Sequence, residues 1–372
     1  MLTYRPTPRW GLFRHCVLGT ALFLAALVAA GCGGDDETET TAETVGTEDL
    51  AAVKDYLTEH SAHLAAQVAI LRENGEEYYE LAESVDFDYD QLMKEHGDEV
   101  AELLSESKEA YVAANPAYEE MEGIVAGVPR LAQYDVDIDA GSDASDPENA
   151  VSFSLELPNG ETLKQPGNLF FVTETALYGT NPDFLAKGVK QDVDGDGKVE
   201  FGEGIPDADT YVAAVREFEE QARALDVDAQ AFEPTPSDAF TALTIMTPTM
   251  SEYFETWKNT RFVAGKQATE PAFVASSRLS DIADILEGLA FTYDEIEPQI
   301  SEESPQQAEQ TGRALNELLA YVEDLRDTEA EGRKYTAEEA DTLGAEAQRR
   351  AEDIAGQITQ AAQRLGIDLQ EA

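Results

Sequence analysis

Apolar residues recur at helical spacing through most of this 372-residue chain, and this periodicity limits the fold more than any other feature. Leu50, Val53 and Leu57 begin the pattern, in steps of three and four that align side chains on one helical face. Comparable stripes follow at Val100, Leu103, Leu104 and Tyr111; Val212, Val215, Ala222 and Leu225; Met250, Tyr253, Phe254 and Trp257; Leu279, Ile282, Ile285, Leu286 and Leu289; Leu315, Leu318, Val322 and Leu325; and Leu343, Ala347, Ile354, Ile358 and Leu365. The sequence therefore predicts a mainly α fold built from two antiparallel helical bundles.

Local signals predict where individual helices begin and end. We expect Asn74-Gly75 to end the first helix and Pro116 to end or kink the second. Thr336 and Glu339 have the spacing of a capping box, which predicts the start of the last helix. Gly366 is suited to its C-cap.

One short segment has strand-like rather than helical alternation. Val151, Phe153, Leu155 and Leu157 alternate with polar residues and are followed by the turn sequence Pro158-Asn159-Gly160. This pattern predicts a β-hairpin between the bundles. The apolar segment 169–178 then predicts a buried helix.

The first 31 residues have the pattern of a targeting segment. Arg5, Arg9 and Arg14 precede an apolar run, Cys16 to Ala30, that is too short to cross a bilayer comfortably. Ala29-Ala30-Gly31-Cys32 then resembles a lipobox, in which the Cys32 thiol receives diacylglycerol. We expect a lipid-anchored protein on the extracytoplasmic face of the cell membrane; the alternative is a plain secretory signal cleaved nearby.

The charge of the chain excludes some partners. The sequence has 25 basic and 76 acidic residues, and loss of residues 1–31 leaves 22 basic residues and a net charge of −54. Such a surface repels nucleic acid and anionic headgroups, and it attracts cations or reflects a salty habitat. The two cysteines, Cys16 and Cys32, leave the mature domain without a disulfide or a cysteine nucleophile.

Composition and periodicity together divide the chain into five segments. Residues 33–49 are acidic and almost free of large apolar residues, as in a flexible tether. The predicted segments are a signal peptide (1–31), the tether with its lipidated cysteine (32–49), a first bundle with the hairpin (50–182), a calcium loop (183–206) and a second bundle (207–372).

The calcium loop is the most specific motif in the sequence. Residues 192–203, DVDGDGKVEFGE, fit the twelve positions of an EF-hand loop, with Gly197 at the sharp turn. The predicted Ca²⁺ ligands are Asp192, Asp194, Asp196, the Lys198 carbonyl, Glu200 through water, and bidentate Glu203. Because no second loop exists to pair with it, we expect a structural site of weak affinity, about 10⁻⁴ to 10⁻³ M. The alternative is an acidic, glycine-rich surface loop.

From about Leu50 onwards the chain resembles the imelysin-like family, particularly the EfeO/EfeM-type iron-uptake proteins. The resemblance rests on several short segments: Ala110-Tyr111 with Tyr118-Glu119-Glu120-Met121-Glu122, Asp137-Ile138-Asp139-Ala140, Asn168 to Tyr178, Ser277-Arg278-Leu279-Ser280-Asp281 with Glu287-Gly288, and Arg364-Leu365-Gly366. It implies capture of iron for a permease. The chain departs from the family pattern because Phe171 replaces the histidine of His-x-x-Glu and Arg278 replaces a later histidine.

The resemblance and the residue pattern suggest a second metal site. Glu174 and Asp281 remain at family positions, and Glu119 and Glu122, three residues apart, lie on one helical face. Carboxylates alone would favour a hard cation such as Fe³⁺, Mn²⁺, Ca²⁺ or Mg²⁺. The alternatives are a solvated acidic face for Glu119 and Glu122, and pairing of Glu174 with Arg261 or Arg278.

Three functions remain open at this stage. The first is an extracytoplasmic binding protein that captures a cation, with iron as the cargo. The second is a calcium-stapled surface lipoprotein that binds a polysaccharide or protein partner and has no iron role. The third, a metallopeptidase, is disfavoured because the sequence has no His-Glu-x-x-His motif and only four histidines.

Overall fold

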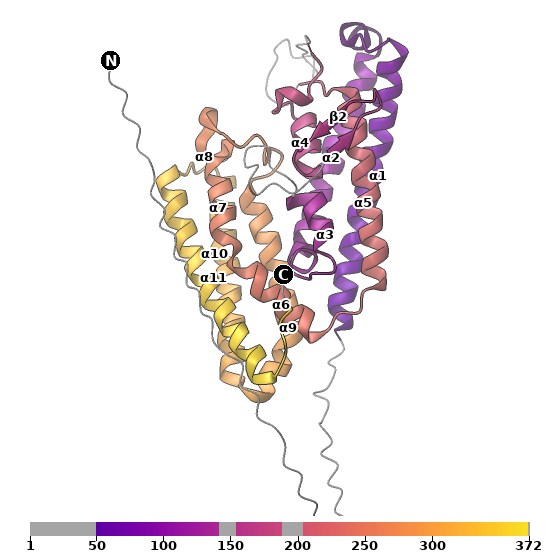
Figure 1. The fold of residues 1–372 in the computed structure, drawn as a ribbon. Helices are drawn as coiled ribbons and strands as arrows, with labels where there is room; N and C mark the ends of the chain where they lie inside the picture. Colours follow the sequence, from indigo (N-terminus) through magenta and orange to yellow (C-terminus); the bar gives the residue numbers. More distant parts are fainter. Residues whose placement is uncertain (1–49, 141–153, 188–203, 371–372) are drawn as a thin grey trace, which may run out of the picture. The chain divides into compact units, whose positions relative to one another are not determined.

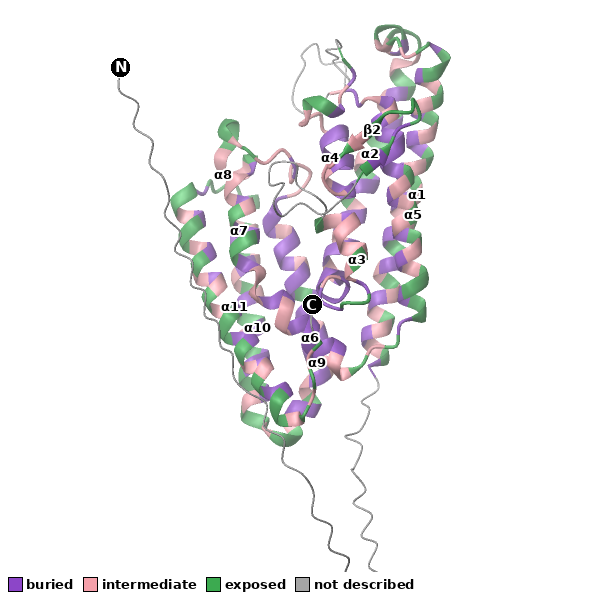
Figure 2. Cartoon of the chain, viewed as in Figure 1, coloured by how far each residue is buried: buried purple, intermediate pink, exposed green. Residues whose placement is uncertain are grey.

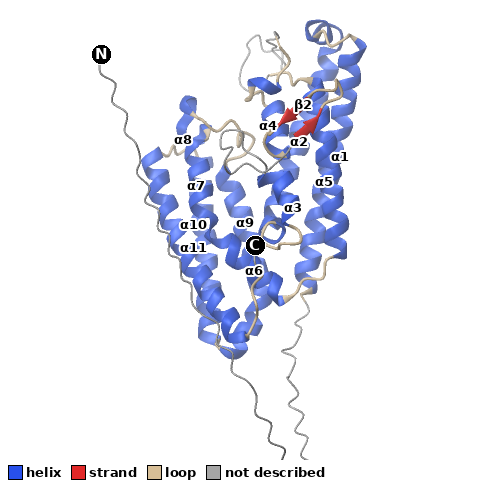
Figure 3. Cartoon of the chain, in the orientation of Figure 1, coloured by secondary structure: helices blue, strands red, loops and turns tan. Residues whose placement is uncertain are grey.

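The computed structural model describes residues 50–140, 154–187 and 204–370 (Figure 1). These residues are predominantly helical, with one two-stranded antiparallel hairpin, as Figure 3 shows. The mainly α fold expected from the periodicity is therefore confirmed. Within the described ranges, none of the helices combines the length and apolarity needed to cross a membrane.

The first group of helices consists of α1 (Ala51–Ser84), α2 (Tyr89–Val125) and α5 (Ala208–Ala231), and α1 packs along both of the others. The short helix α3 (Ala132–Asp135) and a π-helical turn, Val136–Ala140, follow α2. The helix α4 (Leu169–Leu177) packs on α5, and a 3₁₀ turn, Pro182–Phe184, comes after it.

The second group contains α9 (Arg278–Glu303), α10 (Pro305–Ala330) and α11 (Ala337–Leu365), with α7 (Met250–Asn259) and α6 (Pro236–Met246) packed on α11. The short segments are Thr247–Thr249, α8 (Arg261–Ala264) and Gly265–Gln267. The groups meet where α2 packs against α9. At this contact a Cβ on Gly288 would lie 1.9 Å from the backbone oxygen of Glu120, so only glycine allows the two helices to approach so closely.

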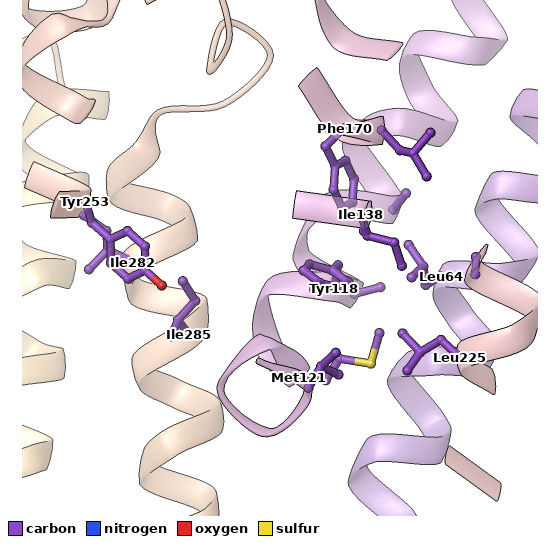
Figure 4. Close-up of a cluster of buried hydrophobic side chains, with 14 of the residues drawn as sticks. Leu64, Tyr118, Met121, Ile138, Phe170, Leu225, Tyr253, Ile282 and Ile285 are labelled. Carbon is purple, nitrogen blue, oxygen red and sulfur yellow. The ribbon is translucent and has the colours of Figure 1, made fainter. Parts of the chain in front are cut away.

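Buried apolar side chains from both groups form one hydrophobic cluster (Figure 2). Figure 4 shows part of it, with Leu64, Tyr118, Met121 and Phe170 near one another and Ile282 and Ile285 on α9. Tyr118 directly precedes Glu119 on α2, and Met121 directly precedes Glu122, so the packing of this helix fixes the position of both carboxylates.

Several predicted boundaries are confirmed. The β-hairpin pairs β1 (Ser154–Glu156) with β2 (Thr162–Lys164) around the predicted turn. Thr336 and Glu339 form a reciprocal capping box at the start of α11, and Gly366, in the left-handed conformation, caps its end. The apolar segment 169–178 forms α4 and its C-cap residue.

The predicted helix end at Asn74-Gly75 was wrong, and of the two outcomes expected at Pro116 the helix end was wrong. The helix α1 continues through Asn74-Gly75 to Ser84, because the missing Cβ of Gly75 lets Val215 of α5 pack against the backbone. The helix α2 also continues through Pro116, and its one non-helical residue is His96. At Gly75 tertiary packing outweighs local propensity.

Candidate metal centre

A cavity of about 840 Å³ lies between the two helical groups. Its walls come from α2, the π-helical turn after α3, the segment 163–168, α4, α7, and the loop that precedes α9. Phe171, Phe184 and Phe273 contribute aromatic surface, whereas Glu119, Glu122 and Asp139 contribute carboxylates. The cavity therefore places acidic groups beside apolar surface, which strengthens their electrostatic interactions.

Glu119 and Glu122 are almost completely buried, with exposed fractions of 1 % and 3 %. One oxygen of each accepts a hydrogen bond: Glu119 Oε1 from Asn115 Nδ2 at 3.0 Å, and Glu122 Oε1 from the Tyr253 hydroxyl at 2.8 Å. The second oxygen of each, Oε2, has no hydrogen-bond partner. Burial of a carboxylate oxygen without a hydrogen-bond partner costs free energy. A cation or a hydrogen-bond donor beside these two oxygens would therefore be stabilising.

Asp139 completes the cluster. Completely buried Ile138 holds the π-helical turn against the core, and the neighbouring Asp139 then lies close to α2. One carboxylate oxygen from each of Glu119, Glu122 and Asp139 lies within 4.8 Å of the others. Three hard oxygen donors at such spacing suit a metal cation that prefers carboxylates.

Arg278 and Asp281 approach the cluster from the first turn of α9. Arg278 Nη1 donates to Asp281 Oδ2 at 3.1 Å and lies 3.7 Å from Glu119 Oε2, while Nη2 lies 4.0 Å from Asp139 Oδ2. Burial alone would lower the pKa of Arg278, but the surrounding carboxylates, Glu119 first, keep that pKa above its ordinary value. The guanidinium therefore stays charged and partly neutralises the cluster.

The carboxylates of the cluster hold protons more tightly than exposed ones. Burial, followed by the charge of Asp281, raises the pKa of Glu119 well above its ordinary value. Burial also raises the pKa of Asp139 to about 6, against the opposing charge of Arg278, and the pKa of Asp281 to about 8. A cation that binds here must compete with protons.

Glu174 lies in the wall of the same cavity but has a different environment. Its Oε2 accepts the backbone N–H of Phe273 at 2.7 Å, and its Oε1 accepts those of Val274 and Ala275 at 2.9 Å each. Burial raises its pKa to about 7, although these three hydrogen bonds act in the opposite direction. Glu174 pairs with neither Arg261 nor Arg278; it anchors the loop before α9.

Among the four residues proposed for the second site, the structure thus brings Glu119 and Glu122 together and gives Glu174 and Asp281 other partners. Sequence reasoning missed Asp139 as a ligand and Asn115 and Tyr253 as donors to the cluster. Two signals could have pointed to Asp139: the Asp-rich stretch in which it lies, and the segment Asp137-Ile138-Asp139-Ala140 that resembles the imelysin-like family. Nothing local to Tyr253 predicts its contact with Glu122, 131 residues away.

Two sequence-derived candidates, the calcium loop 192–203 and Cys32, lie outside the described residues. The structure also contains a second, partly exposed acidic group, formed by Glu120, Asp284 and Glu287, and His60 Nδ1 lies 2.9 Å from Glu120 Oε2. Phe171 lines the cavity and packs edge-on against Phe184, so this position supplies an apolar wall.

Comparison with known proteins gives a match to a family model. No curated protein matches the chain. The sequence profile of a family described as imelysin, also called peptidase M75, matches residues 50–361, which include every residue of the cavity discussed above. This chain belongs to the imelysin family.

Proposed function

We propose that this protein is a lipid-anchored extracytoplasmic binding protein that captures a hard metal cation in the cavity lined by Glu119, Glu122 and Asp139. Membership in the imelysin family is consistent with a role in iron uptake, and we take iron as the cargo. The principal support is the pair of buried oxygens that lack a hydrogen-bond partner, Glu119 Oε2 and Glu122 Oε2. A cation bound there would be a direct ligand partner for both.

The chemistry of the donors supports a hard cation over a soft one. The cluster offers carboxylate oxygens, and neither histidine nor cysteine lines the cavity among the described residues. Carboxylates favour Fe³⁺, Mn²⁺, Mg²⁺ and Ca²⁺, whereas imidazole and thiolate favour Zn²⁺ and Cu⁺. Fe³⁺ suits the site well because three carboxylates match its charge. We assign no catalytic role to this cavity.

Cation titration of the full-length chain, purified in detergent, tests this function. We expect Fe³⁺, supplied as a weak chelate, and Mn²⁺ to bind, and Glu122→Gln to weaken binding about 100-fold, since it removes one charged ligand. Glu252→Gln is the matched control, because Glu252 lies on the same cavity but is exposed and outside the three-carboxylate cluster. Equal affinity in the wild type and Glu122→Gln would exclude the proposed site.

We further propose that residues 192–203 bind one structural Ca²⁺. The support is the fit of the sequence to all the ligand positions of an EF-hand loop. Glu203→Gln should abolish Ca²⁺ binding, since it removes the bidentate ligand, whereas Glu200→Gln, at a position that acts through water, should weaken it less. If Ca²⁺ is the only cation that binds, and Glu203→Gln removes it, the protein is a calcium-stapled surface lipoprotein with another partner.

A further inference from the structure

Arg278 reaches the same carboxylates that we assign to the cargo. Its side chain is 6 % exposed, and its guanidinium lies 3.7 Å from Glu119 Oε2 and 4.0 Å from Asp139 Oδ2. Glu119 Oε2 is one of the two oxygens without a hydrogen-bond partner. A guanidinium and a metal cation cannot both lie beside this buried oxygen without strong repulsion.

The guanidinium also has partners outside the three-carboxylate cluster. Asp281 Oδ2 accepts a hydrogen bond from Nη1 at 3.1 Å, and the rings of Tyr253 and Phe273 lie 4.6 and 4.7 Å from the guanidinium carbon. Arg278 Nε is buried and has no hydrogen-bond partner. An arginine that was a purely structural partner of Glu119 and Asp139 would form direct hydrogen bonds with them; here both separations exceed hydrogen-bond length.

We infer that Arg278 is an internal counter-cation that the cargo displaces. In the free protein the guanidinium neutralises Glu119 and Asp139, and on binding it withdraws toward Asp281 and the two aromatic rings. Arg278 thereby lowers the affinity for the cation, and Asp281 is a positioning residue that draws the guanidinium away. This inference rests on the proposed function of the cavity and specifies what determines its affinity.

Opposite effects of two substitutions test the inference, with Mn²⁺ as the probe and calorimetry on the full-length chain. Arg278→Gln should raise the Mn²⁺ affinity about tenfold or more, because the competing charge is gone. Asp281→Asn should lower it, because the released guanidinium then binds Glu119 and Asp139 more tightly. In the Arg278→Gln background, Asp281→Asn should change the affinity by less than about threefold, since Asp281 acts through Arg278.

Two further variants protect the test against misfolding. Arg278→Lys keeps the charge and should keep the low affinity. Arg278→Ala should bind Mn²⁺ tightly until guanidinium chloride is added, because the free ion can then fill the vacated place between the rings. Sodium chloride at the same ionic strength should have a smaller effect, and wild type should respond equally to both salts.

The outcomes separate the two proposals. If Glu122→Gln abolishes Mn²⁺ binding but Arg278→Gln leaves it unchanged, the counter-cation role is wrong and the cation site stands. If Arg278→Gln weakens binding, Arg278 instead holds an anion that binds together with the metal, and the inference is again overturned. If neither wild type nor Arg278→Gln binds Mn²⁺ or Fe³⁺, the proposed function and this inference fail together.

Discussion

The carboxylate of Glu174 on α4 accepts the backbone N–H of Phe273 at 2.7 Å, and the ring of Phe273 lies 4.7 Å from the guanidinium carbon of Arg278. Phe273 has a φ of 52°, in the left-handed region that is unfavourable for residues other than glycine. The loop before α9 is therefore held in a strained conformation by a buried carboxylate from another helix, and this loop supplies one of the rings around Arg278.

Removal of the Glu174 side chain should destabilise the protein. Glu174→Ala leaves the N–H groups of Phe273, Val274 and Ala275 without their acceptor and opens a cavity, so we expect a loss of about 2–4 kcal/mol in the free energy of unfolding. Urea unfolding followed by circular dichroism measures it. Asp183→Ala, at an exposed position on the same cavity, should change the value by less than about 0.5 kcal/mol. An equal effect of the two substitutions would contradict the anchoring role.

The destabilisation caused by Glu174→Ala should depend on pH. Burial raises the pKa of Glu174 from 4.5 to about 7, so the folded protein binds this proton more tightly than the unfolded chain does. The stability that protonation contributes is fully present below pH 4.5 and is lost as the pH rises through 7. The difference between wild type and Glu174→Ala should therefore be larger at pH 5 than at pH 8, by about 1 kcal/mol or more. A difference that grows with pH would show that the ionised form is the stabilising one.

Much of the helical framework can be predicted from short-range signals. The capping box at Thr336 and the left-handed Gly366 depend only on residues within one turn, and both appear where expected. Gly75 shows the limit of this approach. Its sequence neighbours indicate a helix end, but the decisive contact is with Val215, 140 residues further on, and the helix continues.

The candidate site also combines features that the local sequence predicts with features that depend on the whole fold. The spacing of Glu119 and Glu122 predicts that they share a helical face, and the structure agrees. Asp139 and Arg278 reach this face from segments whose positions depend on the whole fold, so no local pattern predicts the cluster. The hydrogen bonds that the loop before α9 donates to Glu174 also join residues about 100 positions apart.

Cation binding should release protons. The pKa of Asp139 is about 6 and that of Asp281 about 8, both raised by burial, so the free site is partly protonated near neutral pH. A metal cation favours ionised carboxylates. The Mn²⁺ affinity should therefore rise from about pH 5.5 to about pH 8, the range in which these two carboxyl groups lose their protons. Calorimetry at about pH 6.5, in two buffers with different ionisation enthalpies, measures the number of protons released. Identical binding enthalpies in both buffers would mean that no protonated carboxylate takes part.

The close approach of α2 and α9 should be essential to both stability and the site. In Gly288→Ala the new Cβ would lie 1.9 Å from the Glu120 backbone oxygen, and the helices must separate. We expect a loss of about 1–3 kcal/mol in the free energy of unfolding and weaker Mn²⁺ binding, because Glu119 and Arg278 lie on the two helices that move apart. Gly356→Ala on α11 is the matched control, since its Cβ meets no atom within 4 Å and should stabilise the helix slightly. Comparable destabilisation by both substitutions would show that helix packing at Gly288 is unimportant.

The two cysteines should differ completely in their effect on membrane attachment. Cys32 follows Ala29-Ala30-Gly31, the small residues that a lipoprotein signal places before its modified cysteine, whereas Cys16 lies at the start of the apolar run that would be removed. We expect Cys32→Ser to abolish incorporation of radiolabelled palmitate and to release the protein from the membrane fraction, because the thiol that carries the acyl chains is gone. Cys16→Ser should leave both properties unchanged. Palmitate incorporation that persists in Cys32→Ser would indicate another site of attachment, and a lack of incorporation in the unaltered chain would indicate a plain secretory signal.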